Sequence, residues 1–328
     1  MRILYIGGTG EISYACIQEG LRLGHDITVF NRARRVDSLP PGVHQIKGEV
    51  CDEKAYAALA DQHWDVVCQF IAYAPEAVER DIATFRGKVG QYLFISSASA
   101  YQKPPRNVVI TEDVPLENPY WPYSRAKAAM EARLMQAHHD QVLPVTIVRP
   151  SHTYRLHIPI GIFIGGDHVA WRLAQGRPVI VHGDGTSLWT ITHADDFAVP
   201  FVRLLGNGRA LGEAFHITAH LSALPWNQIV TTFAAALGVE ARIVHVPSDT
   251  LVRFNSNWSG PLLGDKTWSV LFDNSKVMSV AGPFTCRTPL AQGFAAVAAD
   301  FRRRLDAGQY KPDLALHAQI DQIIASQP

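Results

Sequence analysis

A tyrosine and a lysine lie four residues apart in the segment YSRAK at positions 123–127. This spacing places the phenol of Tyr123 and the ammonium of Lys127 on one face of a helix. A free phenol has a pKa of about 10 and is a poor base at neutral pH, but a neighbouring positive charge lowers that pKa. Tyr123 is therefore predicted to exchange a proton with a substrate oxygen, with Lys127 as its charged neighbour.

A serine-rich segment supplies a third candidate group. The run FISSASAY at positions 94–101 begins as an apolar strand and ends in small and hydroxyl residues. Ser97 offers a hydroxyl that can bind the reacting oxygen from the side opposite Tyr123. The alternative for Ser97 is a turn serine whose hydroxyl is satisfied locally. Taken together, the pattern predicts Ser97, Tyr123 and Lys127 as catalytic residues and calls for no metal.

The glycine-rich turn GGTGEIS occupies positions 7–13, between a strand-like run and a helical pattern. The first glycine permits a tight turn, and Gly10 lets the backbone approach a pyrophosphate. Free amides at the start of the following helix favour the same anion. A purely structural strand-helix turn is the alternative. The turn predicts a dinucleotide cofactor held by Gly7, Thr9, Gly10, Glu11 and Ile12.

The end of the second strand-like run indicates which dinucleotide is bound. A carboxylate that would hold the adenosine ribose hydroxyls is absent there, and the chain reads FNRARR at positions 30–35. Arginine suits a 2′-phosphate because its guanidinium makes bidentate contacts. Asn31, Arg32 and Arg35 are therefore predicted cofactor contacts, and NADP is favoured over NAD. A solvated basic loop is the alternative reading.

Strand-like and helix-like segments alternate through residues 1–150, which are expected to form the dinucleotide-binding domain. This alternation predicts an α/β fold with a doubly wound parallel sheet. Residues 195–218 add a helix and a strand that are expected to rejoin the sheet. Residues 151–194 and 219–328 are expected to form a smaller C-terminal α/β lobe that binds the substrate. The strand-like runs are 3–6, 26–30, 43–47, 66–70, 92–95 and 145–148.

The composition excludes several classes of protein. Of the 328 residues, 47% are hydrophobic and 18% are charged, as in ordinary globular chains. Thirty basic residues balance thirty acidic ones, so no global field attracts nucleic acid or a membrane surface. The four cysteines have neither disulfide-framework nor metal-site spacing. No apolar run approaches the length of a membrane helix, about 18 residues. A soluble, cytoplasmic protein is expected.

These segments, together with NPYWPYSRAK at 118–127, VRPSHTY at 148–154 and VHGDGTSLWTITHADDFA at 181–198, resemble the extended short-chain dehydrogenases/reductases of the NAD-dependent epimerase/dehydratase group. The resemblance covers about residues 1–240. It implies a Rossmann-type domain with a small substrate lobe and the three catalytic residues above. It also implies further cofactor contacts at Ile71, Ala72, Pro150 and His152, besides Tyr123 and Lys127.

Departures from the family pattern narrow the chemistry. The 4,6-dehydratases carry an Asp-Glu pair after the catalytic hydroxyl residue, where this chain has Ala98 and Ser99, so that chemistry is not expected. His152 replaces an asparagine and Trp189 an arginine that contact the diphosphate of nucleotide sugars. Arg155, Arg253 or Arg287 is available to compensate. The predicted substrate contacts are Ser99, His152, Trp189 and His193.

The sequence thus predicts an NAD(P)-dependent oxidoreductase or epimerase that transfers hydride at a carbinol or ketone carbon. The expected partner is a small sugar-like substrate without a nucleotide diphosphate. A nucleotide-sugar 4-epimerase that retains NAD is an alternative reaction. A relative that binds RNA or senses cofactor without redox turnover is an alternative from another class. The family resemblance also implies a homodimer.

Overall fold

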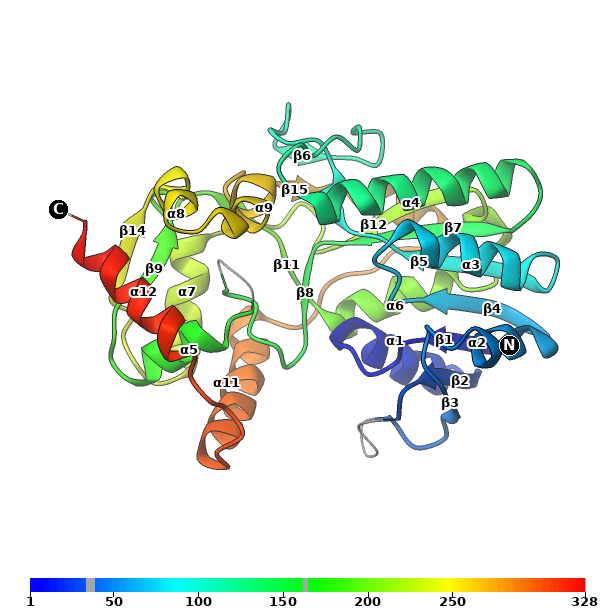
Figure 1. Cartoon of the computed structure of the whole chain (residues 1–328), viewed down its shortest axis with the longest axis horizontal. Helices are drawn as coiled ribbons and strands as arrows, with labels where there is room; N and C mark the ends of the chain where they lie inside the picture. The colour runs from blue at the N-terminus through cyan, green and yellow to red at the C-terminus, as the bar shows by residue number, and fades with distance from the viewer. Residues whose placement is uncertain (34–38, 162–164, 328) are drawn as a thin grey trace.

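The computed structural model describes residues 1–33, 39–161 and 165–327, and its largest sheet has seven strands, which lie in the right-hand half of Figure 1. The strand order is β12-β7-β5-β4-β1-β2-β3, and every neighbouring pair is parallel. The order reverses between β1 and β4, which is where such sheets bind ligands. The predicted parallel sheet is confirmed. Its strands are β1 (Arg2–Ile6), β2 (Asp26–Asn31), β3 (His44–Lys47), β4 (Trp64–Gln69), β5 (Val89–Ile95), β7 (Val145–Pro150) and β12 (Glu213–Ile217).

Helices cover both faces of this sheet. Because successive side chains of a strand point to opposite faces, Ile3 and Tyr5 pack into one apolar cluster and Leu4 and Ile6 into another. The first cluster includes α1, α6 and α10, and the second includes α2, α3 and α4. These helices are α1 (Glu11–Arg22), α2 (Glu53–Ala57), α3 (Pro75–Phe85), α4 (Pro122–His139), α6 (Ala194–Leu204) and α10 (Ser275–Ala281).

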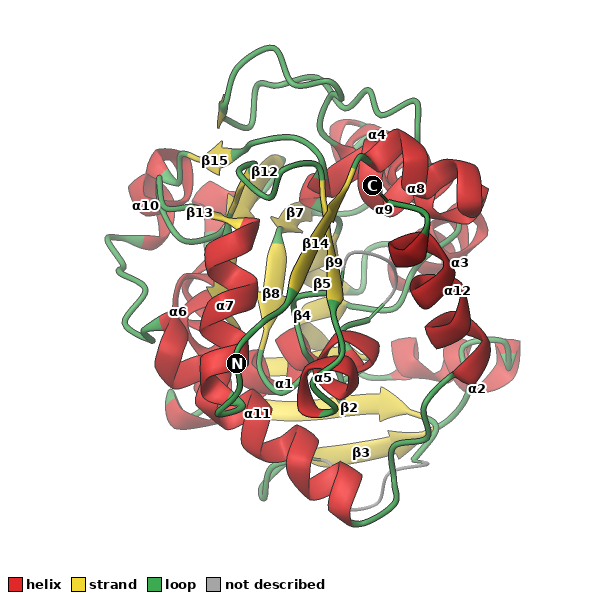
Figure 2. Ribbon diagram, turned by 90° about the vertical axis from the view of Figure 1, so that its left-hand side faces the viewer, coloured by secondary structure: helices red, strands yellow, loops and turns green. Residues whose placement is uncertain are grey.

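A third apolar cluster lies in the other part of the molecule, where a two-stranded parallel ladder packs among helices (Figure 2). The ladder joins β9 (Val179–His182) to β14 (Ile243–Val246). Its helices are α5 (Asp167–Ala174), α7 (Trp226–Ala236), α8 (Ser248–Phe254), α11 (Leu290–Asp306) and α12 (Leu314–Ala325). Short elements complete the chain: β6 (Val109–Ile110), β8 (His152–Tyr154), β10 (Leu188–Trp189), β11 (Ile191–His193), β13 (Leu224–Pro225), β15 (Leu271–Phe272), α9 (Ser259–Pro261) and a π-helical turn (Leu262–Lys266).

The described residues also test the expectations about membranes, metals and disulfides. None of the helices in the described ranges combines the length and the apolar character that a membrane span needs. Within the same ranges, no group of three histidine, cysteine or acidic side chains is arranged to hold a metal ion. All four cysteines are free thiols.

Candidate active site

The glycine turn follows β1 at the carboxyl end of the sheet, and its shape depends on glycine. Gly7 has φ +81°, and a Cβ there would lie 2.6 Å from Cγ2 of Ile71. A Cβ on Gly8 would lie 2.7 Å from Val29. Ser13 closes the turn, since its hydroxyl accepts a hydrogen bond of 3.1 Å from the amide of Gly10. The backbone is therefore left bare at the start of α1, as a pyrophosphate requires.

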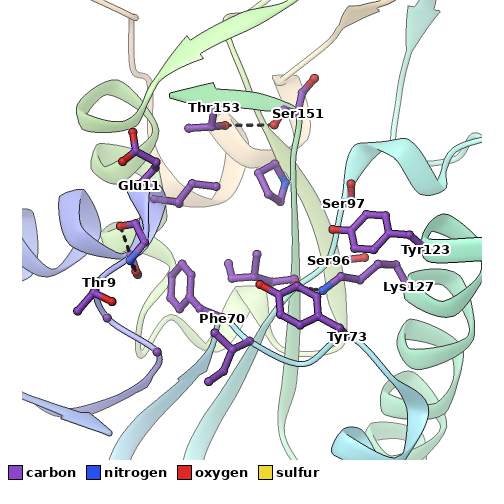
Figure 3. Close-up of a pocket in the computed structure, with 18 residues that line it drawn as sticks. Thr9, Glu11, Phe70, Tyr73, Ser96, Ser97, Tyr123, Lys127, Ser151 and Thr153 are labelled. Carbon is purple, nitrogen blue, oxygen red and sulfur yellow. Dashed lines mark hydrogen bonds between the residues drawn. The ribbon is translucent and has the colours of Figure 1, made fainter. Parts of the chain in front are cut away.

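A cavity of about 370 Å³ opens beside this turn (Figure 3). The predicted residues Gly7, Thr9, Gly10, Glu11 and Ile12 line one wall. The opposite wall carries a tyrosine and a lysine from one helix (Figure 3). The bare turn and the helix amino end fit a dinucleotide, so these residues are suited to hold one. The rest of the lining is Gly8, Ser13, Phe70, Ile71, Tyr73, Ile95, Ser96, Ser97, Tyr123, Lys127, Pro150, Ser151 and Thr153.

Glu11 makes contacts that the sequence did not indicate. Its carboxylate oxygen Oε2 accepts hydrogen bonds from three successive amides, those of Arg155, Leu156 and His157, at 2.8, 2.5 and 2.7 Å. These residues follow β8, more than 140 positions away in the chain. Glu11 thus fastens the 155–157 segment to the cofactor turn.

The other predicted cofactor contacts are not all part of this lining, and His152 lies in the second cavity described below. Ile71 and Pro150 line the cavity. Asn31 and Arg32 lie at the end of β2, outside that lining; the side-chain oxygen of Asn31 accepts from the amide of Ala33, and Arg32 is exposed. Arg35 lies outside the described residues. Ala72 accepts a hydrogen bond from Lys127 through its carbonyl oxygen, as described next.

Lys127 is held by backbone carbonyls. Its Nζ donates hydrogen bonds to the carbonyl oxygens of Ala72 and Ile95 at 2.9 and 2.8 Å. Burial lowers the pKa of Lys127 to about 8, while the nearby Glu131 opposes that shift. The ammonium also lies 5.2 Å from the ring centre of Tyr73 and 5.8 Å from that of Tyr123. Tyr73 is a lining residue that the sequence analysis missed.

Tyr123 has a higher pKa than the sequence suggested. Burial raises the pKa of its phenol to about 12, while a hydrogen bond with Ser97 opposes the rise. The expectation was a pKa lowered by Lys127. In this structure the desolvation of the phenol outweighs other influences, and Lys127 directs its hydrogen bonds to carbonyls instead. At neutral pH the phenol is protonated, the form that can donate a proton.

Three serine hydroxyls form a line that ends at the phenol. Ser124 donates to the hydroxyl of Ser99 at 2.8 Å, and the hydroxyls of Ser99 and Ser97 lie 2.9 Å apart. The amide of Ser99 also donates to the hydroxyl of Ser97 at 3.2 Å. The Ser97 hydroxyl accepts from the amide of Ser99, and its own proton can point toward Ser99, Tyr123 or a substrate oxygen. Ser124 is fully buried and was not predicted.

A second cavity, of about 320 Å³, lies on the other side of the phenol. Ser97, Tyr123, Pro150 and Ser151 line both cavities, so the two meet at the predicted catalytic residues. The predicted substrate contacts Ser99, His152 and Trp189 lie together here. The remaining lining residues, which sequence analysis missed, are Trp121, Asp265 and Lys266.

The two predicted histidines have different environments. His152 donates from Nε2 to the carbonyl oxygen of Pro159, and burial lowers its pKa to about 4, so the ring is neutral and Nδ1 is an acceptor. Its ring centre lies 6.1 Å from that of Trp189. His193 is not in this cavity. Its Nδ1 accepts from the amide of Asp195 at the start of α6, and it lines a separate cavity of about 180 Å³ behind Trp189.

The chain is similar in sequence to a known family and to curated proteins. The NAD dependent epimerase/dehydratase family matches the chain over residues 3–218. The chain is 25% identical to 2′-dehydrokanamycin reductase of Streptomyces kanamyceticus over 83% of its own length and 77% of that protein. It is 28% identical to the chloroplast stem-loop binding protein of 41 kDa b of Arabidopsis thaliana over 74% of its length, and it spans only 65% of that protein.

The fold has close parallels among solved structures. The structure of UDP-glucuronic acid 4-epimerase from Bacillus cereus, in complex with NAD, superposes with a TM-score of 0.71. The superposition covers 94% of this chain and 98% of that one at 17% sequence identity. At this level of identity the likeness concerns the fold.

Proposed function

Because this chain belongs to the NAD dependent epimerase/dehydratase family, we propose that it transfers hydride between NADP and a carbinol or ketone carbon of a sugar-like compound. The family and its reductase and epimerase relatives make the chain an NAD(P)-dependent oxidoreductase or epimerase of the extended short-chain type. We propose in addition that the protein prefers NADP, that its substrate is sugar-like, and that Ser97, Tyr123 and Lys127 are the catalytic residues.

The meeting of the two cavities carries this proposal. The cavity beside the glycine turn and the cavity beside Trp189 share Ser97 and Tyr123 as a common wall. A cofactor in the first and a substrate in the second would therefore meet where a phenol and a hydroxyl converge. Hydride transfer to a carbon needs a proton donor or acceptor at the attached oxygen at the same time. Tyr123 occupies that position.

When bound, the dinucleotide supplies or accepts the hydride. The protein side of the reaction is the proton and the orientation of the substrate oxygen. In reduction, Ser97 donates a hydrogen bond to the carbonyl oxygen, and the protonated phenol of Tyr123 gives its proton as an alkoxide develops. In oxidation, the phenolate of Tyr123 takes the hydroxyl proton. The ammonium of Lys127, within 5.8 Å of the ring, stabilises that phenolate.

Arg32 supports NADP as the cofactor. It follows Asn31 at the end of β2 and is exposed, and residues 31–33 include no carboxylate. The test compares kcat/KM with NADP and with NAD in the wild-type protein and in Arg32→Asp. We expect the ratio of NADP to NAD to fall at least tenfold in the variant, since each hydrogen bond to a charged group contributes about 1.5–3 kcal/mol. An unchanged ratio would contradict the role of Arg32, and a wild-type ratio below one would argue for NAD.

The lining of the second cavity supports a substrate without a nucleotide diphosphate. Trp189 and His152 are part of that lining, whereas Arg155, Arg253 and Arg287 do not belong to it. Indole and imidazole groups suit the apolar face and the hydroxyls of an uncharged ring. A diphosphate would need charge-assisted donors to offset its desolvation, and Lys266, the cationic side chain of this lining, is already paired with Asp265.

The decisive experiment is a substrate panel. The purified protein is first examined by near-ultraviolet absorbance for retained nicotinamide, then assayed with free sugars, glycosides, polyols and UDP-, GDP- and dTDP-sugars. We expect net turnover of added NADP(H) with an unphosphorylated sugar. Retained NAD with epimerisation of a nucleotide sugar would establish the alternative reaction. Selective RNA binding without any turnover would support the likeness to the chloroplast protein instead.

A further inference from the structure

A π-helical turn brings two opposite charges into the second cavity. The turn spans Leu262–Lys266, and both Asp265 and Lys266 line the cavity that holds Tyr123. Their side chains are only 15% and 7% exposed, and Nζ of Lys266 lies 3.8 Å from Oδ2 of Asp265. Burying two charges is costly unless they are paired or used. Single π-helical turns occur frequently at functional sites.

Three side chains donate hydrogen bonds to backbone carbonyl oxygens of this turn. Trp268 donates from its indole to the carbonyl oxygen of Leu263 at 2.6 Å, and His182 donates from Nε2 to that of Lys266 at 2.8 Å. The side-chain amide of Asn118 donates to the carbonyl oxygens of both Gly264 and Ser99, each at 2.7 Å. Asn118 thereby holds the turn in register with the catalytic serine segment, and the charged pair is preorganised.

The turn also packs tightly against an aromatic wall. A Cβ on Gly264 would lie 3.0 Å from Cβ of Trp121, and one on Gly260 would lie 2.3 Å from its indole ring. The two glycines therefore let the turn press against Trp121, itself a lining residue. Trp189 supplies a second indole to the lining of the same cavity.

A third charge lies close to Asp265. Lys103 is 4% exposed, and its ammonium favours the ionised form of the Asp265 carboxyl, as Lys266 does, although burial raises the pKa of that carboxyl overall. Asp265 is therefore a hydrogen-bond acceptor flanked by donors. The cavity as a whole offers an acceptor and a donor side by side, next to two indole rings.

We propose that Asp265 and Lys266 bind two neighbouring hydroxyl groups of the substrate, which makes the substrate a neutral vicinal diol such as a sugar ring. This inference rests on the proposed function, because it concerns the substrate of the same site. One hydroxyl donates to the carboxylate of Asp265, and the adjacent oxygen accepts from the ammonium of Lys266. Since the pair neutralises itself, a neutral diol satisfies both groups without leaving a further charge in the cavity.

The test uses methyl glycosides of glucose, galactose and mannose, each with its monodeoxy derivatives. Binding to the NADPH-loaded protein, which cannot oxidise a glycoside, is measured by calorimetry, and turnover with NADP⁺ is measured by cofactor absorbance. We expect Asp265→Asn and Lys266→Met to weaken binding of the preferred glycoside about ten- to hundredfold, the effect of losing a hydrogen bond to a charged group. The matched control is Glu213→Gln, which removes an exposed ion pair with Lys276 and leaves binding unchanged.

The deoxy derivatives locate the contact. For each variant, the derivative that lacks the hydroxyl bound by the substituted residue must bind the wild-type protein as weakly as the full glycoside binds that variant. That variant must lose nothing more with this derivative, because both changes remove one interaction. The two derivatives identified in this way must lack neighbouring hydroxyls. Melting temperature and NADPH affinity report whether each variant folds. If one variant does not fold, the deoxy series measured on the wild-type protein and on the other variant still tests the diol subsite.

Several outcomes separate this inference from the proposed function. Glycoside binding that is insensitive to both substitutions overturns the diol subsite alone. Tighter binding of a 2-amino-2-deoxy glycoside or of a uronic acid than of the neutral glycoside overturns the neutral-diol assignment in favour of ionic recognition. If the wild-type protein binds NADPH but none of the glycosides, the sugar-like substrate class falls, and the subsite falls with it.

Discussion

The two cavities share Ser97 and Tyr123, yet one depends mainly on backbone groups and the other on side chains. The cavity proposed for the cofactor depends on backbone features: a glycine turn, the amino end of a helix and the carbonyl groups that hold Lys127. The substrate cavity is made of side chains from separate segments, including Trp121, Trp189 and Asp265. A backbone site demands particular residues at fixed spacing within one short segment. A site made of side chains can be formed by many different residue types, because the fold brings together segments that are far apart in the chain.

The largest effect is expected at the wall that both cavities share. Tyr123→Phe removes the proton donor but keeps the ring, so turnover should fall by about two to four orders of magnitude. Binding of cofactor and of substrate should stay within a few fold of the wild-type values. Steady-state rates and cofactor titration check this. Unchanged turnover would mean that the two cavities meet at this residue without any chemical consequence.

Lys127→Met tests whether the ammonium of Lys127 lowers the pKa of Tyr123. The ammonium favours the phenolate, so its removal should raise the pKa of Tyr123, which burial already holds at about 12. Oxidation should then require a higher pH, because the phenolate fraction at neutral pH falls about tenfold for each unit by which the pKa rises. A pH-rate profile reads the shift. Lys276→Met, which removes an exposed ammonium, is the control and should leave the profile unmoved.

Gly7→Ala tests the backbone character of the cofactor cavity. The new Cβ would lie 2.6 Å from Ile71 at a φ of +81°, so cofactor affinity should fall at least tenfold. Gly24→Ala is matched to it, since Gly24 has φ +77° and open space where the Cβ would be. Both variants should lose about 1 kcal/mol of stability from the left-handed backbone. If Gly24→Ala weakened cofactor binding equally, the loss would reflect strain alone rather than a blocked turn.

The smallest effect on turnover is expected for Ser124, which does not line either cavity but contacts Ser99. Ser124→Ala removes the donor to Ser99 and so loosens the orientation of Ser97; kcat should fall about five- to tenfold, with little change in KM. A merely structural serine would lower the melting temperature without this split between kcat and KM. Ser279→Ala, which removes a surface hydroxyl from α10, serves as the comparison.

The difference between the cavities explains what the sequence could predict. The sheet, the glycine turn and the pair on α4 follow from local patterns, because each depends on residues close together in the chain. Asp265 and Lys266 escaped prediction because they lie beyond residue 240, outside the recognised motifs, and reach the site only by tertiary packing. His193 was predicted to contact the substrate, but it borders a separate cavity behind Trp189. Its position in the sequence does not reveal on which side of the Trp189 ring its side chain lies.

The contact between Glu11 and residues 155–157 has an electrostatic consequence for the cofactor turn. A carboxylate in the first turn of α1 would repel a nearby pyrophosphate, but three amides disperse its charge. The 155–157 segment therefore shields the cofactor from a like charge without being part of the cavity lining. Damage to that distant segment, such as a proteolytic nick, would unmask the repulsion and weaken dinucleotide binding from outside the site.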